Sequence, residues 1–136
     1  MTDSRPLMAG KRGLIMGVAN ERSIAWGIAK AAAAHGAELA FTFQGEALEK
    51  RVRPLAEQIQ SKIVLPADVT DAASMDRLFE SIGATWGKLD FVVHAIAFSD
   101  KDELKGGYID TSRQNFLRTL DISCFSFTAV AQRAAA

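Results

Sequence analysis

The sequence has few cysteines, no excess of either charge and no long apolar run. With Cys124 as the only cysteine among 136 residues, an internal disulfide is excluded and a reducing compartment is expected. The 16 basic and 16 acidic side chains argue against a nucleic-acid binder, which needs a basic excess to displace counterions. No apolar stretch approaches the roughly 20 residues that span a bilayer. We therefore expect a cytoplasmic protein that neither binds nucleic acid nor inserts into a membrane.

Histidine is equally scarce, and no metal site is predicted. The two histidines and the cysteine are too far apart in the sequence to show a metal-ligand spacing. His94 lies in an apolar stretch, where a lone histidine is more often a hydrogen-bonded core residue than a ligand or a base. Cys124 is expected to pack as a small apolar side chain.

Apolar runs and helical patterns alternate along the chain. The short apolar runs predict four strands, at residues 13–18, 38–43, 62–65 and 89–96. The helical patterns predict three intervening helices, at residues 23–35, 46–60 and 72–86. Asp71 is a good N-cap, and Pro54 predicts a bend or a restart of the second helix. After a loop over 97–110, a capping box of Thr111 with Gln114 predicts a last helix that runs toward the end of the sequence.

Strands that are joined by helices pair in parallel, because each crossover is right-handed. The predicted fold class is therefore α/β, with a doubly wound parallel sheet of the Rossmann type. In the common strand order 3-2-1-4-5-6, these four strands supply only 3-2-1-4, which leaves the fourth as an apolar edge. We therefore expect residues 1–136 to be the N-terminal portion of a single domain that is incomplete at its C-terminus.

Ligands of such a sheet bind beyond the carboxyl ends of strands one and four. Gly17 follows strand one and would allow a tight turn beside a phosphate, although a plain turn is equally compatible. Gln44 stands 27 residues later, about where a dinucleotide site places a ribose contact, and a solvated turn residue is the alternative. Asp68 and Val69 suit an adenine contact, or Asp68 caps a helix. Each signal is weak alone, and together they predict a nucleotide site.

Four segments carry a more specific resemblance. They are Gly17–Gly27 (GVANERSIAWG), Ala37–Gln44 (AELAFTFQ), Asp68–Val69 and His94–Phe98 (HAIAF). In order and spacing they resemble the enoyl-acyl-carrier-protein reductases of bacterial fatty-acid synthesis, a divergent group of short-chain dehydrogenases, over nearly the whole chain. The resemblance implies an oxidoreductase that uses NADH to reduce the trans-2 double bond of an enoyl thioester on acyl carrier protein. It also implies a homotetramer.

The resemblance also implies which residues bind the cofactor. These are Gly17, Ser23 and Ile24 at the pyrophosphate, Gln44 at the adenosine, Asp68 and Val69 at the adenine, Ala95, Ile96 and Ala97 at the nicotinamide ribose, and Ile122 in the cofactor pocket. It implies substrate contacts at Ala97 and Phe98. The family more often has serine and glycine where this chain has Ala95 and Ala97. NADH is expected over NADPH, because Gln44 brings no positive charge to a 2′-phosphate.

The catalytic tyrosine and lysine of the family have no counterpart in this sequence. Tyr108 is the only tyrosine, and Asn115 stands where a lysine would follow it. We therefore expect Tyr108 to be a loop anchor and the catalytic pair to lie beyond Ala136. Two alternatives stay open: a carbonyl-reducing short-chain dehydrogenase, which would show Tyr-x-x-x-Lys, and a non-catalytic nucleotide-binding module. The last helix should expose apolar side chains suited to tetramer contacts, namely Phe116, Leu117, Leu120 and Phe127.

Overall fold

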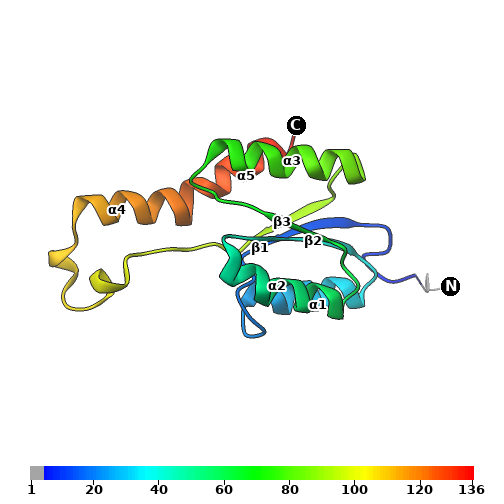
Figure 1. Cartoon of the computed structure of the whole chain (residues 1–136), viewed down its shortest axis with the longest axis horizontal. Helices are drawn as coiled ribbons and strands as arrows, with labels where there is room; N and C mark the ends of the chain where they lie inside the picture. Colours follow the sequence, from blue (N-terminus) through cyan, green and yellow to red (C-terminus); the bar gives the residue numbers. More distant parts are fainter. Residues whose placement is uncertain (1–4) are drawn as a thin grey trace.

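The computed structural model describes residues 5–136, and a parallel sheet lies between two layers of helices (Figure 1). Its strands are β1 (Arg12–Met16), β2 (Glu38–Phe43), β3 (Ile63–Pro66) and β4 (Phe91–His94). Its helices are α1 (Ile24–Ala34), α2 (Glu46–Gln58), α3 (Ala72–Trp86), α4 (Arg113–Leu120) and α5 (Ser126–Ala134). The strand order is β3-β2-β1-β4, all parallel, which confirms the predicted Rossmann-type arrangement.

The two faces of the sheet are covered by different helices (Figure 1). Ile15 and Phe41 point toward α1 and α2, where they pack in one apolar cluster with Trp26 and Val52. Leu14, Met16 and Ala40 belong to a second cluster, in which α3 and α5 supply side chains such as Met75 and Val130. Side chains alternate between the faces of a strand, so burial on both sides explains the apolar runs at residues 14–16 of β1 and 39–41 of β2.

Helix α3 begins and ends at the residues that the sequence predicts. The Asp71 carboxylate accepts a hydrogen bond from the backbone N–H of Ala73 at 3.0 Å, and Gly87 closes the helix with a left-handed backbone. Helix α2 continues through Pro54, so the helix does not restart there, and the bend stays a prediction. Pro54 and its helical neighbours Lys50 and Arg51 are exposed, so water can bond the carbonyl that the proline leaves without a donor.

The last helix differs from the prediction in three ways. Ser112, not Thr111, is the N-cap, because its hydroxyl oxygen accepts from the backbone N–H of Asn115. A wide turn of π type, η3 (Asp121–Phe125), joins α4 to α5 in one continuous helical rod. Cys124 is exposed on that turn, so the expectation that it packs inside is wrong. The cause is that α4 extends past the sheet, and only the α5 part packs on α3 (Figure 1).

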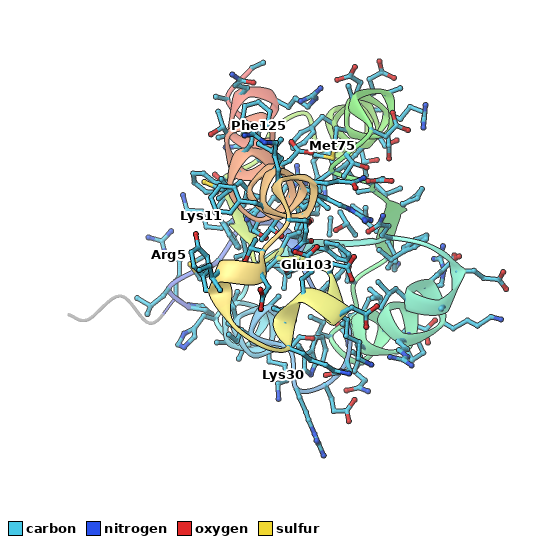
Figure 2. The ribbon with its side chains drawn as sticks, turned by 90° about the vertical axis from the view of Figure 1, so that its left-hand side faces the viewer. Arg5, Lys11, Lys30, Met75, Glu103 and Phe125 are labelled. Carbon is cyan, nitrogen blue, oxygen red and sulfur yellow. The ribbon has the colours of Figure 1, made fainter. Side chains whose placement is uncertain are left out.

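The predicted loop over 97–110 contains two short 3-10 helices, η1 (Lys101–Leu104) and η2 (Tyr108–Asp110). Figure 2 views the molecule from the end where this segment projects, with Glu103 on it. The Glu103 carboxylate accepts from the backbone N–H and the hydroxyl of Ser112, at 2.7 and 2.6 Å, which ties the segment to the start of α4. None of the helices in the described part combines the length and apolar character needed to cross a membrane.

Candidate functional site

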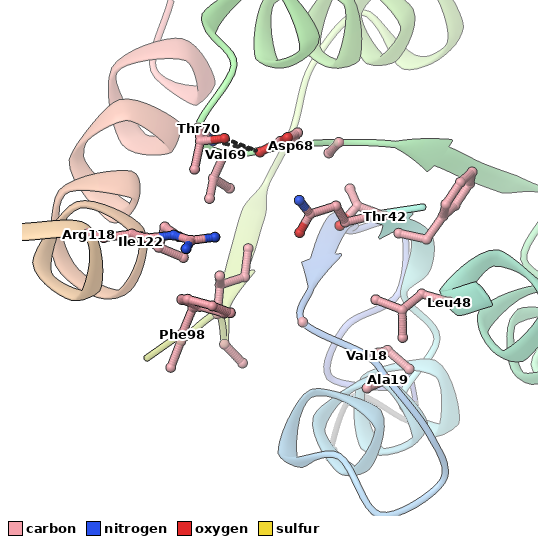
Figure 3. Close-up of a pocket in the computed structure, with 17 residues that line it drawn as sticks. Val18, Ala19, Thr42, Leu48, Asp68, Val69, Thr70, Phe98, Arg118 and Ile122 are labelled. Atoms are coloured by element: carbon pink, nitrogen blue, oxygen red, sulfur yellow. Dashed lines mark hydrogen bonds between the residues drawn. The ribbon is translucent and has the colours of Figure 1, made fainter. Parts of the chain in front are cut away.

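A cleft of about 410 Å³ lies at the carboxyl ends of the strands (Figure 3). Its lining residues come from the segments that follow all four strands, together with one side of the α4–η3 rod. Those that the sequence predicts as site residues are Gly17, Gln44, Asp68, Val69, Ala95, Ile96, Ala97, Phe98 and Ile122. This is the place where the strand order of a doubly wound sheet reverses, and such crevices bind ligands. The fold therefore brings nine predicted residues, far apart in sequence, to one cavity.

Gly17 allows the closest approach of two chain segments in this cleft. Its φ of +109° lies in a region that side-chain-bearing residues rarely adopt. A Cβ placed on Gly17 would overlap the backbone carbonyl oxygen of Ala95, the residue that follows β4. The backbone N–H of Ala95 in turn donates to the carbonyl of Met16 at 3.0 Å. The ends of β1 and β4 are thus held so close that only glycine fits at position 17.

Ser23 and Ile24 do not line the cleft. The Ser23 hydroxyl oxygen accepts from the backbone N–H groups of Ala19 and Asn20, at 2.9 and 3.1 Å, and so fixes the turn before α1. Ala19 does line the cleft, so Ser23 supports the cleft wall through its hydrogen bond with the Ala19 N–H, although Ser23 itself is not a lining residue. The Ile24 side chain is 79% exposed at the start of α1. An anion near this turn would meet the free N–H groups and the positive dipole end of α1.

Asp68 occupies a turn immediately after β3. Its carboxylate oxygen Oδ1 accepts from the backbone N–H and the hydroxyl of Thr70, at 2.9 and 2.6 Å (Figure 3). Its own N–H donates to the hydroxyl oxygen of Ser74 at 3.0 Å. Asp68 is therefore held in place by local bonds, and it is not the cap of α3, which is Asp71. Its second carboxylate oxygen has no partner among the described residues and can accept a donor from a ligand in the cleft.

Phe98 is anchored by the π turn. The Ser123 hydroxyl accepts from the Phe98 N–H at 3.0 Å and donates to the Phe98 carbonyl at 3.2 Å. Ile122, the preceding residue of the turn, is buried and lines the cleft. Ala95, Ile96 and Ala97 form the cleft wall between β4 and this anchor. The turn thereby holds the segment after β4 in place.

Some lining residues were not predicted from the sequence. Thr42, Leu48, Thr70 and Arg118 all contribute to the cleft. Arg118 precedes Ile122 by four residues, a spacing that puts two helical side chains on the same side, so this signal was present once Ile122 had been chosen. Buried Asn115 was missed as well. Its side-chain oxygen accepts from the N–H of Asp100 at 2.9 Å, which holds the segment beyond Phe98.

His94 lies at the end of β4 and serves the core, as predicted. Its Nε2 lies 2.7 Å from the hydroxyl oxygen of buried Ser126, and its ring packs edge-on against Phe127. Burial lowers the pKa of His94 from its usual value of 6.5, although a backbone hydrogen bond opposes the shift. His94 does not line the cleft. It is a half-buried structural residue and not a general base at this site.

Tyr108 also lies outside the cleft, where its ring is 81% exposed on η2. Its backbone carbonyl accepts from the Thr111 hydroxyl at 2.6 Å, which agrees with a loop role. Across residues 5–136, no group of three or more His, Cys, Asp or Glu side chains could hold a metal ion. At the cleft, Gln44, Asp68, Arg118 and backbone groups can bond and orient a ligand.

The parallel sheet and its cleft define a Rossmann-like α/β protein. The profile of a family described as Enoyl-(Acyl carrier protein) reductase matches residues 17–136. The chain belongs to this enoyl-acyl-carrier-protein reductase family.

Individual relatives agree with this assignment. The chain is 68% identical over 129 residues to "Enoyl-[acyl-carrier-protein] reductase [NADH] 2" of Rhizobium meliloti (strain 1021), covering 95% of this chain and 48% of that protein. It is also similar to the crystal structure of FabI from Candidatus Liberibacter asiaticus, with a TM-score of 0.94, 57% identity, and coverage of 96% of this chain and 51% of that one.

A third relative is a solved enoyl-(acyl-carrier-protein) reductase of Anaplasma phagocytophilum, determined in complex with NAD. Its TM-score is 0.92 at 56% identity, and the match covers 96% of this chain and 50% of that one. The chain thus spans about half the length of the relatives it matches.

Proposed function

We propose that this chain forms the cofactor-binding part of an NADH-dependent enoyl-acyl-carrier-protein reductase that acts in fatty-acid elongation. One observation supports the proposal above all: eight of the ten residues expected to bind the cofactor line a single cleft at the reversal point of the sheet. These are Gly17, Gln44, Asp68, Val69, Ala95, Ile96, Ala97 and Ile122. Family membership and the relative solved with NAD point the same way.

Each part of the cleft suits a different part of a dinucleotide. Gly17, Val18 and Ala19 line the cleft on the way from β1 to α1, and a pyrophosphate bound there would lie toward the N-terminus of α1, whose N–H groups attract anions. The free oxygen of Asp68 can accept from the exocyclic amine of adenine, while Val69 and Ile122 offer apolar contact to the ring. In the reaction, NADH supplies a hydride to the β-carbon of the enoyl thioester. The cleft residues named here would bind NADH and orient it.

Gln44 is the basis for proposing NADH over NADPH. It lines the cleft after β2, and its neutral amide can bond a ribose hydroxyl but cannot pair with a 2′-phosphate. The R. meliloti relative carries NADH in its name. We therefore expect NADH to bind at least as tightly as NADPH. A tenfold preference for NADPH, about 1.4 kcal/mol, would contradict this choice.

Fluorescence titration of the chain with NADH tests the proposal directly. The Ile122→Ala variant should weaken NADH binding, because it removes apolar contact from the cleft wall. Ile109→Ala is the matched control, since Ile109 is 92% exposed and lies outside the cleft. Saturable NADH binding that Ile122→Ala weakens and Ile109→Ala leaves unchanged supports the proposal. The absence of NADH binding, or equal effects of both substitutions, refutes it.

We further propose a cytoplasmic homotetramer that acts on enoyl thioesters of acyl carrier protein. Exposed apolar side chains on α4, η3 and α5 support the oligomer: Phe116, Leu117, Leu120, Phe125 and Phe127. Such a concentration of exposed apolar groups is typical of protein interfaces. Light scattering should give a mass four times that of the chain, and a charged substitution such as Leu117→Asp should lower it. A monomeric wild-type protein would count against the tetramer.

A further inference from the structure

Arg118 is a cleft residue to which neither the family motifs nor the proposed function assigns a role. Of the side chains that line the cleft in the described part of the chain, it carries the only positive charge. Its guanidinium extends from α4 toward the space between Phe98 and Val69 (Figure 3). No carboxylate among residues 5–136 pairs with it, although Asp68 lines the same cavity. Its N–H donors are therefore left to water or to a ligand.

The contact that Arg118 does make places its guanidinium beside the Phe98 ring. The guanidinium carbon lies 4.5 Å from the centroid of the Phe98 ring, a cation–π distance. Ser123 holds the backbone of Phe98, because its hydroxyl bonds both the Phe98 N–H and the Phe98 carbonyl. A guanidinium has two flat faces, and a ring bound in the cleft can stack on a face that Phe98 does not cover. The planar guanidinium of Arg118, placed beside Phe98, can therefore stack on a second flat ring.

The residues near the Arg118 guanidinium indicate which ring would stack on it. Arg118 lies one helical turn before Ile122, on the same side of the rod, and Val69 faces it from the end of β3 (Figure 3). Asp68 beside Val69 offers the carboxylate oxygen that an exocyclic amine needs. We propose that Arg118 binds the adenine ring of the dinucleotide by stacking, with Phe98 supporting the guanidinium from behind. This inference rests on the proposed function, because it specifies how that cleft holds the adenosine half.

The competing role for Arg118 is Coulombic, as a point charge that neutralises a phosphate. The two roles differ in whether a lysine at position 118 can replace the arginine. Lysine keeps the charge but has no planar group to stack, whereas a phosphate contact tolerates either cation. They also differ in salt dependence, since screening weakens an exposed charge pair much more than a stacked contact. Arg118 is exposed, so a Coulombic effect would be sensitive to ionic strength.

The test is NADH titration of the wild-type chain, Arg118→Ala, Arg118→Lys and the control Arg113→Ala, at low and at high salt. Arg113 is also an exposed arginine of α4, and it does not line the cleft. We expect Arg118→Ala to weaken NADH binding about fivefold, or ~1 kcal/mol at 1.4 kcal/mol per tenfold. Arg118→Lys should lose nearly as much NADH affinity, and Arg113→Ala should bind NADH as the wild type does. The affinity of each variant relative to wild type should be the same at low and at high salt.

Three results overturn the stacking role. If Arg118→Lys retains wild-type affinity and the loss in Arg118→Ala shrinks at high salt, Arg118 acts as a charge on a phosphate. If every variant binds NADH as the wild type does, Arg118 contributes nothing, while the proposed function stands. If the wild-type chain itself binds no NADH, the proposed cofactor site fails and this inference fails with it. Equal urea midpoints for the four proteins confirm that the substitutions did not unfold the chain.

Discussion

Replacing Gly17 with alanine should damage both the fold and the cleft, because two separate costs meet at this position. The first is conformational, since φ is +109° and an alanine there is strained whatever space surrounds it. The second is steric, since the new Cβ would overlap the Ala95 carbonyl oxygen. That carbonyl belongs to backbone and cannot swing aside as a side chain would. The segment after β4 must therefore move away from β1.

The structure provides a control that separates the two costs. Gly87 ends α3 with a φ of +75°, and a Cβ there would meet nothing within 4 Å. Gly87→Ala should therefore show the conformational cost alone, about 1–2 kcal/mol. Gly17→Ala should show at least that cost plus the overlap, which is ~1–3 kcal/mol by analogy with overpacked cores. Its total loss in the free energy of unfolding is then about 2–5 kcal/mol.

Urea denaturation followed by circular dichroism measures both variants, and NADH titration reports on the cleft. We expect Gly17→Ala to be the less stable variant by about 1–3 kcal/mol and to lose NADH affinity, while Gly87→Ala keeps it. Equal destabilisation by the two substitutions would refute the argument, because it would mean that the approach of Gly17 to Ala95 carries no steric cost.

Three further predictions concern residues outside the lining of the cleft. Burial lowers the pKa of His94 below 6.5, so on acidification the unfolded chain takes up this proton before the folded chain does. The free energy of unfolding should therefore decrease as the pH is lowered past about 6.5. Urea titrations should show a smaller decrease for His94→Gln. Asp71→Ala removes the acceptor for the Ala73 N–H and should cost about 1 kcal/mol in the same assay, whereas Asp71→Asn should cost less. Asn115→Ala leaves the Asp100 N–H without its acceptor and should cost ~1–3 kcal/mol; no loss would show that water replaces the bond.

The sequence was sufficient wherever local chemistry decides the structure. Residues 72–86 have a capping aspartate before them and a glycine after them, and α3 has those same bounds. The strand order could be predicted because parallel strands joined by helices leave few topologies. The same rule explains why Gly17, Gln44 and Asp68 could be assigned to one site: each comes within two residues of the end of a strand, and the carboxyl ends of parallel strands share one edge.

Prediction failed where the outcome depends on contacts across the fold. Cys124 was expected to pack as a small apolar side chain because of its residue type, but the rod that carries it extends past the sheet and leaves it exposed (Figure 1). Ser112 and Thr111 are both common N-cap residue types, and the capping-box spacing to Gln114 had favoured Thr111. Glu103, nine residues upstream of Ser112, bonds both its N–H and its hydroxyl, so a contact from the preceding loop favours Ser112. The four-residue spacing to Ile122 could have placed Arg118 at the cleft, but its contact with the Phe98 ring depends on the fold.

The π turn links the cleft to the core. In a regular α-helix each residue turns by about 100°, so Val130, eight residues after Ile122, would point about 80° away from it. The one residue that a π turn adds reduces this difference to about 20°. Ile122 can then line the cleft while Val130 packs in the apolar cluster beside α3, and both are buried. Ser126 stabilises the arrangement, because its buried hydroxyl contacts both the Ile122 carbonyl and His94. The same turn therefore sets the wall of the cleft and the packing of α5.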